Sequence, residues 1–464
     1  MQISPARRAA FQILRRVEDE AAYSAPLLAR ADDDLGAKDR GLCHELVLGV
    51  LRKQLWLDRT IEHFASRKID SLDLSVVIAL RLGLYQLRFL SRIPASAAIN
   101  ESVNLVKTAR LKSAAGFVNA VLRRATREPE YDPAASVREP AEKISIETSH
   151  PQWLIERWQN QFGLEETAAM TRANNEPAVV AFRFATKALR AREGATAELI
   201  RELKTSGAGL IESTIAPGGW RVTTVQDGEL EDAGRDAGVP QAGMPALLRR
   251  FSDEGLIYFQ DEGSQLVAHL LGARGGERVL DVCAAPGSKA TLIAALAPQS
   301  EIVACDLYEH RAQTMRRLAA QQQTDNIRFV VDDATGPLPF PSRSFDRVLV
   351  DAPCSGTGTL RHNPEIRWRL KPSDFVELID KQQSILHHAS EMVTAGGILL
   401  YSTCSMETEE NEGVATAFLK GHPDFEIAPL QLPAELLTRD GVARTWPHRD
   451  GADGFFAIAF RRME

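Results

Sequence analysis

The chain has 464 residues and a formal net charge of −7, with 44% hydrophobic and 25% charged residues, which is the composition of an ordinary folded protein of several domains. No run of about 18 apolar residues occurs, so we expect no membrane association, and the polar residues 1–8 predict no signal peptide. The five cysteines are odd in number and widely spaced, which argues against a disulfide framework.

The cysteine spacing also bears on metals and on compartment. No pair lies at the Cys-x-x-Cys spacing of a zinc site, so we expect no bound metal. Free thiols in a chain of this length predict a reducing, cytoplasmic location. Cys43, Cys283 and Cys305 lie inside or at the edges of apolar segments, as small buried hydrophobic residues do. We also expect the protein to be a monomer.

Residues 5–128 carry apolar side chains at helical spacing almost throughout, which predicts an all-α bundle over residues 1–130. This region contains 21 Lys and Arg and 15 Asp and Glu, so its charge is +6 and that of the remainder is −13. A basic face can bind a polyanion whatever the total charge, because screening confines the effect of a charge to roughly 10 Å. Solvated helix faces explain many of these charges equally well, and a protein-interaction module is an alternative role.

The bundle resembles the NusB-like RNA-binding domain. The residues that carry the resemblance are Asp39-Arg40, Glu45-Leu46-Val47, Arg92-Ile93-Pro94 and Gly116-Phe117-Val118-Asn119. The resemblance implies that residues 1–130 bind RNA.

The charged stretch 129–144 contains Pro129, Pro133 and Pro140, which predicts a linker. Apolar segments at 179–184 and 220–225 predict strands with helical stretches between them. Residues 145–250 therefore predict a small α/β domain. This domain resembles the RRM-like domain found beside RNA methyltransferase cores.

Residues 251–464 predict a Rossmann-like α/β domain. A strand at 277–282 leads into a small-residue turn and a helix, a geometry that brings backbone amides close to a ligand. The next two strands end in Asp306 and in Asp332-Asp333, where carboxylates can meet a ribose and an adenine. Capping of a helix is the alternative for any single aspartate. With no Gly-x-x-x-x-Gly-Lys loop, the set predicts S-adenosylmethionine rather than NAD or ATP.

The fourth and fifth predicted strands, 345–350 and 397–401, each precede a cysteine. Cys354 lies in Asp351-Ala352-Pro353-Cys354-Ser355, and Cys404 lies in Thr403-Cys404-Ser405. Apolar runs of this length are typical of strands buried on both faces of a parallel sheet. Both thiols should therefore lie just past the carboxyl ends of strands, where ligands and chemistry collect in open α/β sheets.

Together these motifs resemble the Sun/Fmu (RsmB-type) RNA 5-methylcytosine methyltransferases, strongly over residues 251–464 and well over residues 1–130. The residues that carry the resemblance are Cys283-Ala284-Ala285-Pro286-Gly287-x-Lys289, Asp351-Ala352-Pro353-Cys354-Ser355, Arg361-x-x-Pro364-Glu365-x-x-Trp368, Thr403-Cys404-Ser405 and Asp453-Gly454-Phe455-Phe456. Departures are small: Ser288 replaces a frequent Gly, and Asp332 replaces the Gly before Asp333. Neither departure removes a catalytic group.

The resemblance implies methyl transfer from S-adenosylmethionine to carbon 5 of a cytosine in RNA, through a cysteine adduct at carbon 6. It implies that Cys404 is the nucleophile and that Cys354 assists release, although the residues alone leave this order open. Asp351 is our candidate for protonating or hydrogen-bonding the ring nitrogen N3, and Lys289 for holding Asp351. The predicted cofactor-binding residues are Cys283, Ala284, Ala285, Pro286, Gly287, Ser288, Lys289, Asp306, Asp333 and Asp351.

The domain arrangement implies 16S ribosomal RNA as the substrate. The same chemistry on transfer RNA is one alternative, and an RNA-binding, antitermination-like protein with a vestigial methyltransferase domain is another. A basic loop at 355–372 supports RNA as the substrate. Its Arg361, His362, Arg367, Trp368 and Arg369 can contact phosphates and stack on an unstacked base, and an ordinary basic surface loop is the alternative.

Overall fold

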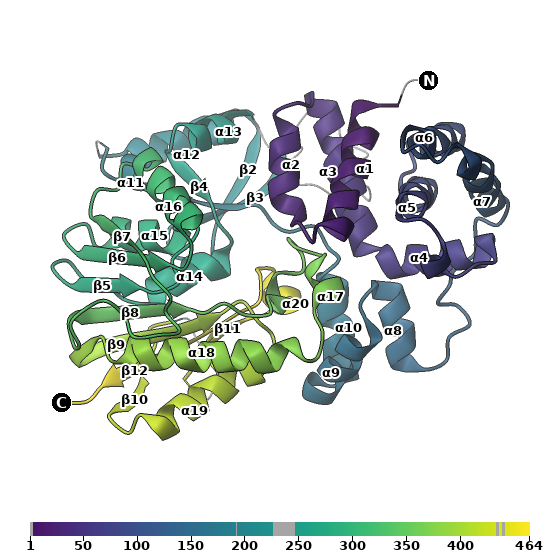
Figure 1. The fold of residues 1–464 in the computed structure, drawn as a ribbon. Coiled ribbons are helices and arrows are strands. Elements are labelled where there is room, and N and C mark those ends of the chain that lie inside the picture. Colours follow the sequence, from purple (N-terminus) through teal and green to yellow (C-terminus); the bar gives the residue numbers. More distant parts are fainter. Residues whose placement is uncertain (1–2, 192, 226–245, 433–435, 439–440) are drawn as a thin grey trace. The chain divides into compact units, whose positions relative to one another are not determined.

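The computed structural model describes residues 3–191, 193–225, 246–432, 436–438 and 441–464 (Figure 1). The described chain divides into two compact units. The first contains the chain up to Ala178 together with Leu360–Arg369, and the second contains the other described residues from Val179 onward. The predicted domain boundaries at 1–130, 145–250 and 251–464 stay predictions.

The first unit begins with a bundle of seven α-helices. These are α1 (Pro5–Asp19), α2 (Ser24–Asp32), α3 (Ala37–Arg52), α4 (Gln54–Ala65), α5 (Leu74–Phe89), α6 (Ala95–Thr108) and α7 (Ala115–Arg127). The helix α5 is buried from Val76 to Gln86, so it forms the centre of the bundle (Figure 1). This confirms the all-α prediction.

Part of the positive charge of the bundle is internal. Arg81 on α5 is buried and donates hydrogen bonds of 2.7 Å to both Asp58 and Glu18. Arg7 is also buried and bonds to Gln86 over 2.6 Å. By contrast, Arg110, Lys112, Arg123 and Arg127 are exposed at the α6–α7 turn and along α7. Of these two groups, the second is available to a polyanion from solvent and the first is not.

Three further helices complete this part of the first unit: α8 (Pro140–Thr148), α9 (Gln152–Phe162) and α10 (Leu164–Ala173). Pro140 is the first residue of α8, where a missing N–H costs nothing, and the Glu139 carboxylate caps the helix. The predicted linker at 129–144 therefore extends too far, because its last five residues are helical.

Leu360–Arg369 lies in sequence between the two site cysteines but belongs to the first unit, and we call it the strap. Glu365 in the strap accepts hydrogen bonds from the Ser24 N–H over 2.7 Å and from its hydroxyl over 3.1 Å. The Trp368 indole N–H donates to the Leu51 carbonyl over 3.4 Å. Within the strap, Ile366–Arg369 forms the short helix α17.

The arginines of the strap point into the first unit. Arg367 is fully buried, and its Nη1 donates to the Thr148 and Ser149 carbonyls and, over 2.9 Å, to Asn175 Oδ1. Arg361 is buried and donates to the Pro177 carbonyl over 2.8 Å. The prediction that these two arginines contact RNA phosphates is therefore wrong, because both side chains are buried and donate to groups of the first unit.

The second unit contains two sheets. The smaller sheet is antiparallel in the order β2-β3-β1-β4, and α11 (Thr186–Leu189), α12 (Ala195–Thr205) and α13 (Ala246–Asp253) accompany it. Its strands are β1 (Ala181–Phe184), β2 (Ala208–Glu212), β3 (Gly219–Val225) and β4 (Ile257–Phe259). Phe182, Leu203, Leu248 and Phe251 form its buried core. The structure confirms a small α/β domain here.

The larger sheet has the strand order β10-β12-β9-β8-β5-β6-β7, with β11 paired to β12. Its strands are β5 (Arg278–Asp281), β6 (Glu301–Asp306), β7 (Ile327–Val331), β8 (Phe345–Asp351), β9 (Val393–Thr403), β10 (Phe425–Ala428), β11 (Ala443–Thr445) and β12 (Phe455–Arg462). The strands from β5 to β9 are parallel, and β12 is antiparallel to β9 and to β10. This confirms the Rossmann-like prediction.

Helices cover both faces of this sheet (Figure 1). Side chains of α14 (Glu262–Leu270) and α15 (Ser288–Leu296) pack with Leu349 of β8 on one face. Side chains of α18 (Asp374–Ser390) and α19 (Val414–Gly421) pack with Val348 and Val350 on the other. Strand order reverses at β5, whose neighbours are β6 and β8. Such a switch point opens a crevice at the carboxyl ends of the strands.

The strap generates a prediction about stability. Arg367→Ala should lower the free energy of unfolding by about 3 kcal/mol or more, because it removes several charge-assisted hydrogen bonds and leaves buried carbonyls without donors. The matched control is Arg123→Ala, which removes an exposed arginine of α7. Urea unfolding of the full chain measures both variants, and equal midpoints for the two would show that the buried position of Arg367 is wrong.

Candidate active site

The turn after β5 has the backbone geometry of a ligand cradle. Gly287 has φ +103°, and a Cβ there would lie 3.3 Å from the Met315 side chain, so a larger residue would be both strained and crowded. The Ala284 N–H donates to the Cys305 carbonyl over 2.8 Å, which fixes the turn against β6. Ser288 then begins α15, whose N-terminus presents free amides toward the carboxyl ends of the strands.

Asp306 ends β6 beside this turn. Its side chain is only 3% exposed, and one carboxylate oxygen accepts the Ala285 N–H over 3.2 Å. The other oxygen lies 3.3 Å from Arg311 Nη1. The structure thus brings two predicted cofactor elements, the 283–289 turn and Asp306, into direct contact.

Asp333 lies just past β7 and is exposed. Its Oδ1 accepts the Thr335 N–H over 3.0 Å and the Thr335 hydroxyl over 2.7 Å, and these hydrogen bonds lower the pKa of Asp333. These bonds close a local turn, and no helix follows Asp333 before β8, so Asp333 is not a helix cap. Its contact with a cofactor stays a prediction.

Lys289 and Asp351 form an ion pair at the ends of α15 and β8. Lys289 Nζ lies 2.7 Å from Asp351 Oδ2, and the Ser402 hydroxyl donates to Asp351 Oδ1 over 2.8 Å. The second contact follows from the β8–β9 register, which sets Asp351 opposite Ser402. Burial disfavours the ammonium, but negative neighbours, chiefly the Asp351 carboxylate, together raise the pKa of Lys289.

The two predicted catalytic thiols touch. Cys354 Sγ lies 3.3 Å from Cys404 Sγ, and both residues are partly exposed. The hydrogen bond with Cys404, and then burial, raise the pKa of Cys354 well above its ordinary value. Two thiolates this close would repel each other, so the arrangement fits one thiolate beside one thiol. Cys43 and Cys305 differ from Cys354 in the main cause of their pKa shift. Burial raises the pKa of each to about 12, as expected for inert buried cysteines.

The sequence reasoning missed Asp281, the last residue of β5. It is completely buried, and neither carboxylate oxygen has a hydrogen-bond partner among the described residues. Burial, and then the negative charge of Asp351, raise the pKa of Asp281 to about 7. An acid inside an otherwise apolar strand was the available signal. An unpaired carboxylate beside the 283–289 turn fits a ligand with a cationic group, such as S-adenosylmethionine.

Glu410 and Asn411 were also missed. Both are fully buried and contact the residues that flank the two cysteines. In the sequence they lie in a run of acidic residues, Glu409 to Glu412, which is the pattern of a solvated helix face. The available signal was their position a few residues after Thr403-Cys404-Ser405.

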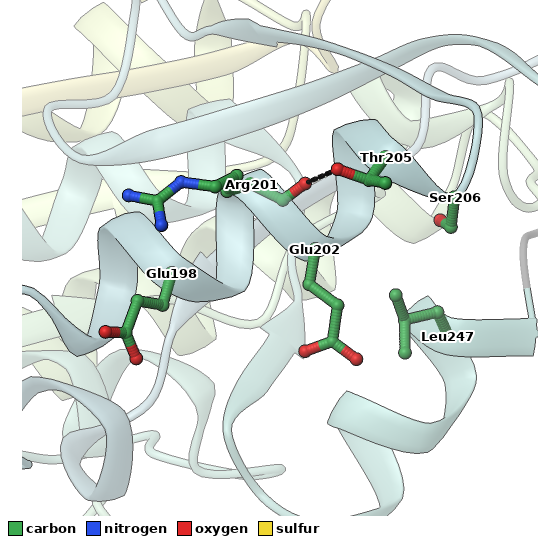
Figure 2. A pocket seen from close by; sticks show the side chains of 6 residues that line it. All are labelled: Glu198, Arg201, Glu202, Thr205, Ser206 and Leu247. Carbon is green, nitrogen blue, oxygen red and sulfur yellow. Dashed lines mark hydrogen bonds between the residues drawn. The ribbon is translucent and has the colours of Figure 1, made fainter.

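A second hollow lies elsewhere in this unit. Figure 2 shows a groove on α12 and α13 that is lined by Glu198, Arg201, Glu202, Thr205, Ser206 and Leu247. Glu202 pairs there with Arg250 over 2.8 Å. None of the predicted site residues lines this groove. In the part of the chain that the structure describes, no helix is long and apolar enough to cross a membrane, and no three potential metal ligands cluster.

Asp281 gives the site a predicted pH dependence. The pKa of Asp281 in the free protein is about 7, above the ordinary 3.8. Between these two pH values the carboxyl is protonated in the folded protein and ionised in the unfolded chain. Asp281 alone therefore makes the fold less stable as pH rises from about 4 to 7. A cationic ligand favours the ionised form, so its affinity should rise by up to about tenfold per pH unit up to about pH 7 and then level off.

Calorimetric titration with S-adenosylmethionine from pH 5.5 to 8 measures this effect. The variant Asp281→Asn has no titratable group at this position, so it should lose the rise in S-adenosylmethionine affinity between pH 5.5 and about 7. An identical pH profile for the two proteins would show that Asp281 does not sense the cofactor.

The family described as 16S rRNA methyltransferase RsmB/F matches residues 268–461. The NusB family matches residues 4–127, and a ferredoxin-like domain of RsmF/B-like methyltransferases matches residues 150–227. A solved structure, PH0851, aligns over 100% of both chains with a TM-score of 0.80 and 26% identity. NSun6 from Pyrococcus horikoshii with SFG aligns over 68% of this chain and 98% of its own, with a TM-score of 0.57 and 22% identity, which shows a shared fold.

Curated relatives match along the whole chain. The probable ribosomal RNA small subunit methyltransferase B of Bacillus subtilis is 34% identical over 100% of both chains. The ribosomal RNA small subunit methyltransferase B of Erwinia tasmaniensis is 31% identical over 96% of both chains. This protein therefore belongs to the RsmB/F family of S-adenosylmethionine-dependent ribosomal RNA small subunit methyltransferases.

Proposed function

We propose that this protein methylates carbon 5 of a cytosine in RNA through a covalent cysteine adduct at carbon 6, and that its substrate is 16S ribosomal RNA. The observation that carries the proposal is the 3.3 Å contact between Cys354 and Cys404, at the same sheet edge as the Lys289–Asp351 pair. The names of the full-length relatives support ribosomal RNA as the substrate class. A vestigial domain has no need to keep two thiols, an acid and a lysine in contact.

Carbon 5 of cytosine is a poor nucleophile and must be activated. Addition of the Cys404 thiolate to carbon 6 makes the ring an enamine, while N3 gains a proton or a strong hydrogen bond. We assign to Asp351 the role of protonating or hydrogen-bonding N3. Asp351 lies between Lys289 Nζ and the Ser402 hydroxyl. Lys289 stands behind Asp351 as a protonated group that can replace a proton passed to the ring.

S-Adenosylmethionine, when bound, supplies the electrophilic methyl group. We assign its ribose hydroxyls to Asp306, its cationic amino acid part to the region of Asp281 and the 283–289 turn, and its adenine to Asp333. The buried Asp306 carboxylate and the unpaired Asp281 carboxylate support these assignments. Lys289 lies in the turn and pairs with Asp351, so one residue serves both halves of the site.

Release requires a base that removes the proton from carbon 5 while the bond between carbon 6 and the Cys404 sulfur breaks. We assign this role to Cys354. Its pKa is raised chiefly by its hydrogen bond with Cys404, so Cys354 is a thiol before the addition. Once Cys404 is bonded to carbon, its negative charge is gone, and Cys354 can ionise more easily. Cys354 then gives its own proton to solvent, takes the proton from carbon 5 and so returns to a thiol, while Cys404 leaves carbon 6 as a thiolate.

We assign RNA binding outside the pocket to the exposed basic residues of the α6–α7 turn and α7, which are Arg110, Lys112, Arg123 and Arg127. The target cytosine must leave its stack to reach the thiols, which favours an unpaired or looped region of the RNA.

Single substitutions separate the roles of the cysteines. Cys404→Ala should abolish both methylation and any covalent adduct. Cys354→Ala should still add to the ring and transfer the methyl group, but release should stall. A protein–RNA complex should then accumulate that survives denaturing gel electrophoresis.

Reversed behaviour would refute this assignment. An adduct that forms with Cys404→Ala and vanishes with Cys354→Ala would make Cys354 the nucleophile. Near-normal turnover of Cys354→Ala without an adduct would mean that Cys354 only fills space behind Asp351.

The basic residues of the bundle can be tested without deleting it, which matters because Ser24 and the Leu51 carbonyl bind the strap. The combined variant Arg110→Ala, Lys112→Ala, Arg123→Ala should weaken RNA binding. It should also reduce the slope of log affinity against log salt by about 2, since each lost phosphate contact on a single strand removes about 0.7. Filter binding across a salt series measures the slope, and an unchanged slope would favour a protein-interaction role for this face.

A further inference from the structure

A buried acidic residue connects the two cysteine turns. Glu410 lies in a π-helical turn, Glu409–Gly413, which begins four residues after Ser405. Such turns are rare and often occur at functional sites. Glu410 and its neighbour Asn411 are both 0% exposed. A buried carboxylate is costly unless several donors surround it, so its partners show what it is for.

The Glu410 carboxylate has four donors. Its Oε1 accepts the Ser355 N–H and the Gln382 side-chain amide, each over 2.9 Å. Its Oε2 accepts the hydroxyls of Ser355 and Ser405. Ser355 directly follows Cys354, and Ser405 directly follows Cys404. One carboxylate therefore ties the residue after each thiol to the same point.

Among the described residues, the Asn411 side chain hydrogen-bonds to the Cys404 turn and not to the Cys354 turn. Its side-chain oxygen accepts the Thr403 hydroxyl, and its amide donates to the Ser405 carbonyl over 2.9 Å. Thr403 and Ser405 flank Cys404 on either side. Asn411 therefore supports the Cys404 turn, whereas Glu410 bonds to both turns.

From these contacts we infer that Glu410 is a positioning residue that holds the Cys354 thiol against the Cys404 thiol, and that it is needed at the step that uses both thiols. In the proposed function, on which this inference rests, addition needs only Cys404, while release needs Cys354 as well. Loss of Glu410 should therefore slow release more than addition. Loss of Asn411 should impair addition itself.

The spacing of the thiols can be measured without RNA or cofactor. Diamide takes two electrons and two protons from a pair of thiols, which leaves a disulfide and the reduced hydrazine. Peptide mapping by mass spectrometry then gives the rate at which Cys354 joins Cys404. Glu410→Ala should slow this rate by about tenfold or more, and a rate equal to or above that of the wild type would overturn the inference.

Two further variants keep this test decisive. Glu410→Gln should react at close to the wild-type rate, because its amide oxygen can accept from the Ser355 N–H and from Gln382 while its NH₂ donates to the serine hydroxyls. Glu262→Gln is the matched control, since Glu262 is a buried carboxylate of the same unit that pairs with Arg221 and Ser213. It should also react at the wild-type rate. If Glu410→Ala does not fold, Glu410→Asp replaces it, because its shorter side chain cannot reach both turns.

The second readout uses RNA and denaturing gels. Glu410→Ala should accumulate a covalent adduct, while Asn411→Ala should lose adduct and methyl transfer together. If Glu410→Ala and Asn411→Ala lose the two activities in parallel, Glu410 has no separate role in release. A wild-type protein that forms neither adduct nor methylated RNA would contradict the proposed function, and the diamide rates would still decide whether Glu410 sets the thiol spacing.

Discussion

The parallel pairing of β8 with β9 is the constraint on which the site depends. It sets Asp351 opposite Ser402, so a hydrogen bond of 2.8 Å joins the last residue of β8 to the next-to-last residue of β9. Both strands are buried on both faces, which leaves little freedom for their ends to move apart. The chain leaves each strand through a short turn, and the two turns bring Cys354 and Cys404 into contact. Lys289 joins from the helix after β5, the strand at which the sheet order reverses.

The charged groups around the Cys354–Cys404 contact determine which ligand and which proton transfers the site favours. Burial, and then the charge of Asp351, raise the pKa of Asp281; negative neighbours led by Asp351 raise that of Lys289 against the effect of burial; and the hydrogen bond with Cys404 raises that of Cys354. A site of this kind favours a cationic ligand and holds protons ready to move. It also explains why one lysine is placed among several acids: Lys289 compensates Asp351 and keeps that carboxylate in a fixed position. The Glu410 carboxylate differs from Asp351, because neutral hydrogen-bond donors rather than a cation surround it.

The strap lies in sequence between the two site cysteines but belongs to the first unit. Between the two cysteines the chain runs through Leu360–Arg369, which supplies buried side chains to the first unit. A segment that lies in sequence between the two site cysteines therefore makes buried hydrogen bonds within the first unit. Arg361, Pro364, Glu365 and Trp368 form one of the motifs that carry the family resemblance. The structure gives two of them a structural role, since Glu365 binds Ser24 and Trp368 binds the Leu51 carbonyl.

The elements that the sequence predicted well are those with a local signature. Continuous apolar runs predicted β5 to β9, helical spacing predicted the bundle, and the small residues at 283–289 predicted the turn. The errors arose where a charged residue is buried by distant partners. Arg367 has the sequence pattern of a surface arginine, and only the folded first unit supplies the carbonyls that bind it. Glu410 lies in an acidic run, and only the π-helical turn directs it toward Ser355 and Ser405.

The central claim is that the Cys404 sulfur bonds to carbon 6 of a cytosine. RNA that carries 5-fluorocytidine tests it most directly, because fluorine at carbon 5 cannot leave as a proton and the adduct persists after methyl transfer. The wild-type protein is incubated with this RNA and S-adenosylmethionine, digested with protease and nuclease, and mapped by mass spectrometry. The account predicts a methylated fluoropyrimidine nucleotide on the peptide that contains Cys404. A nucleotide on the Cys354 peptide, or on neither, would contradict it.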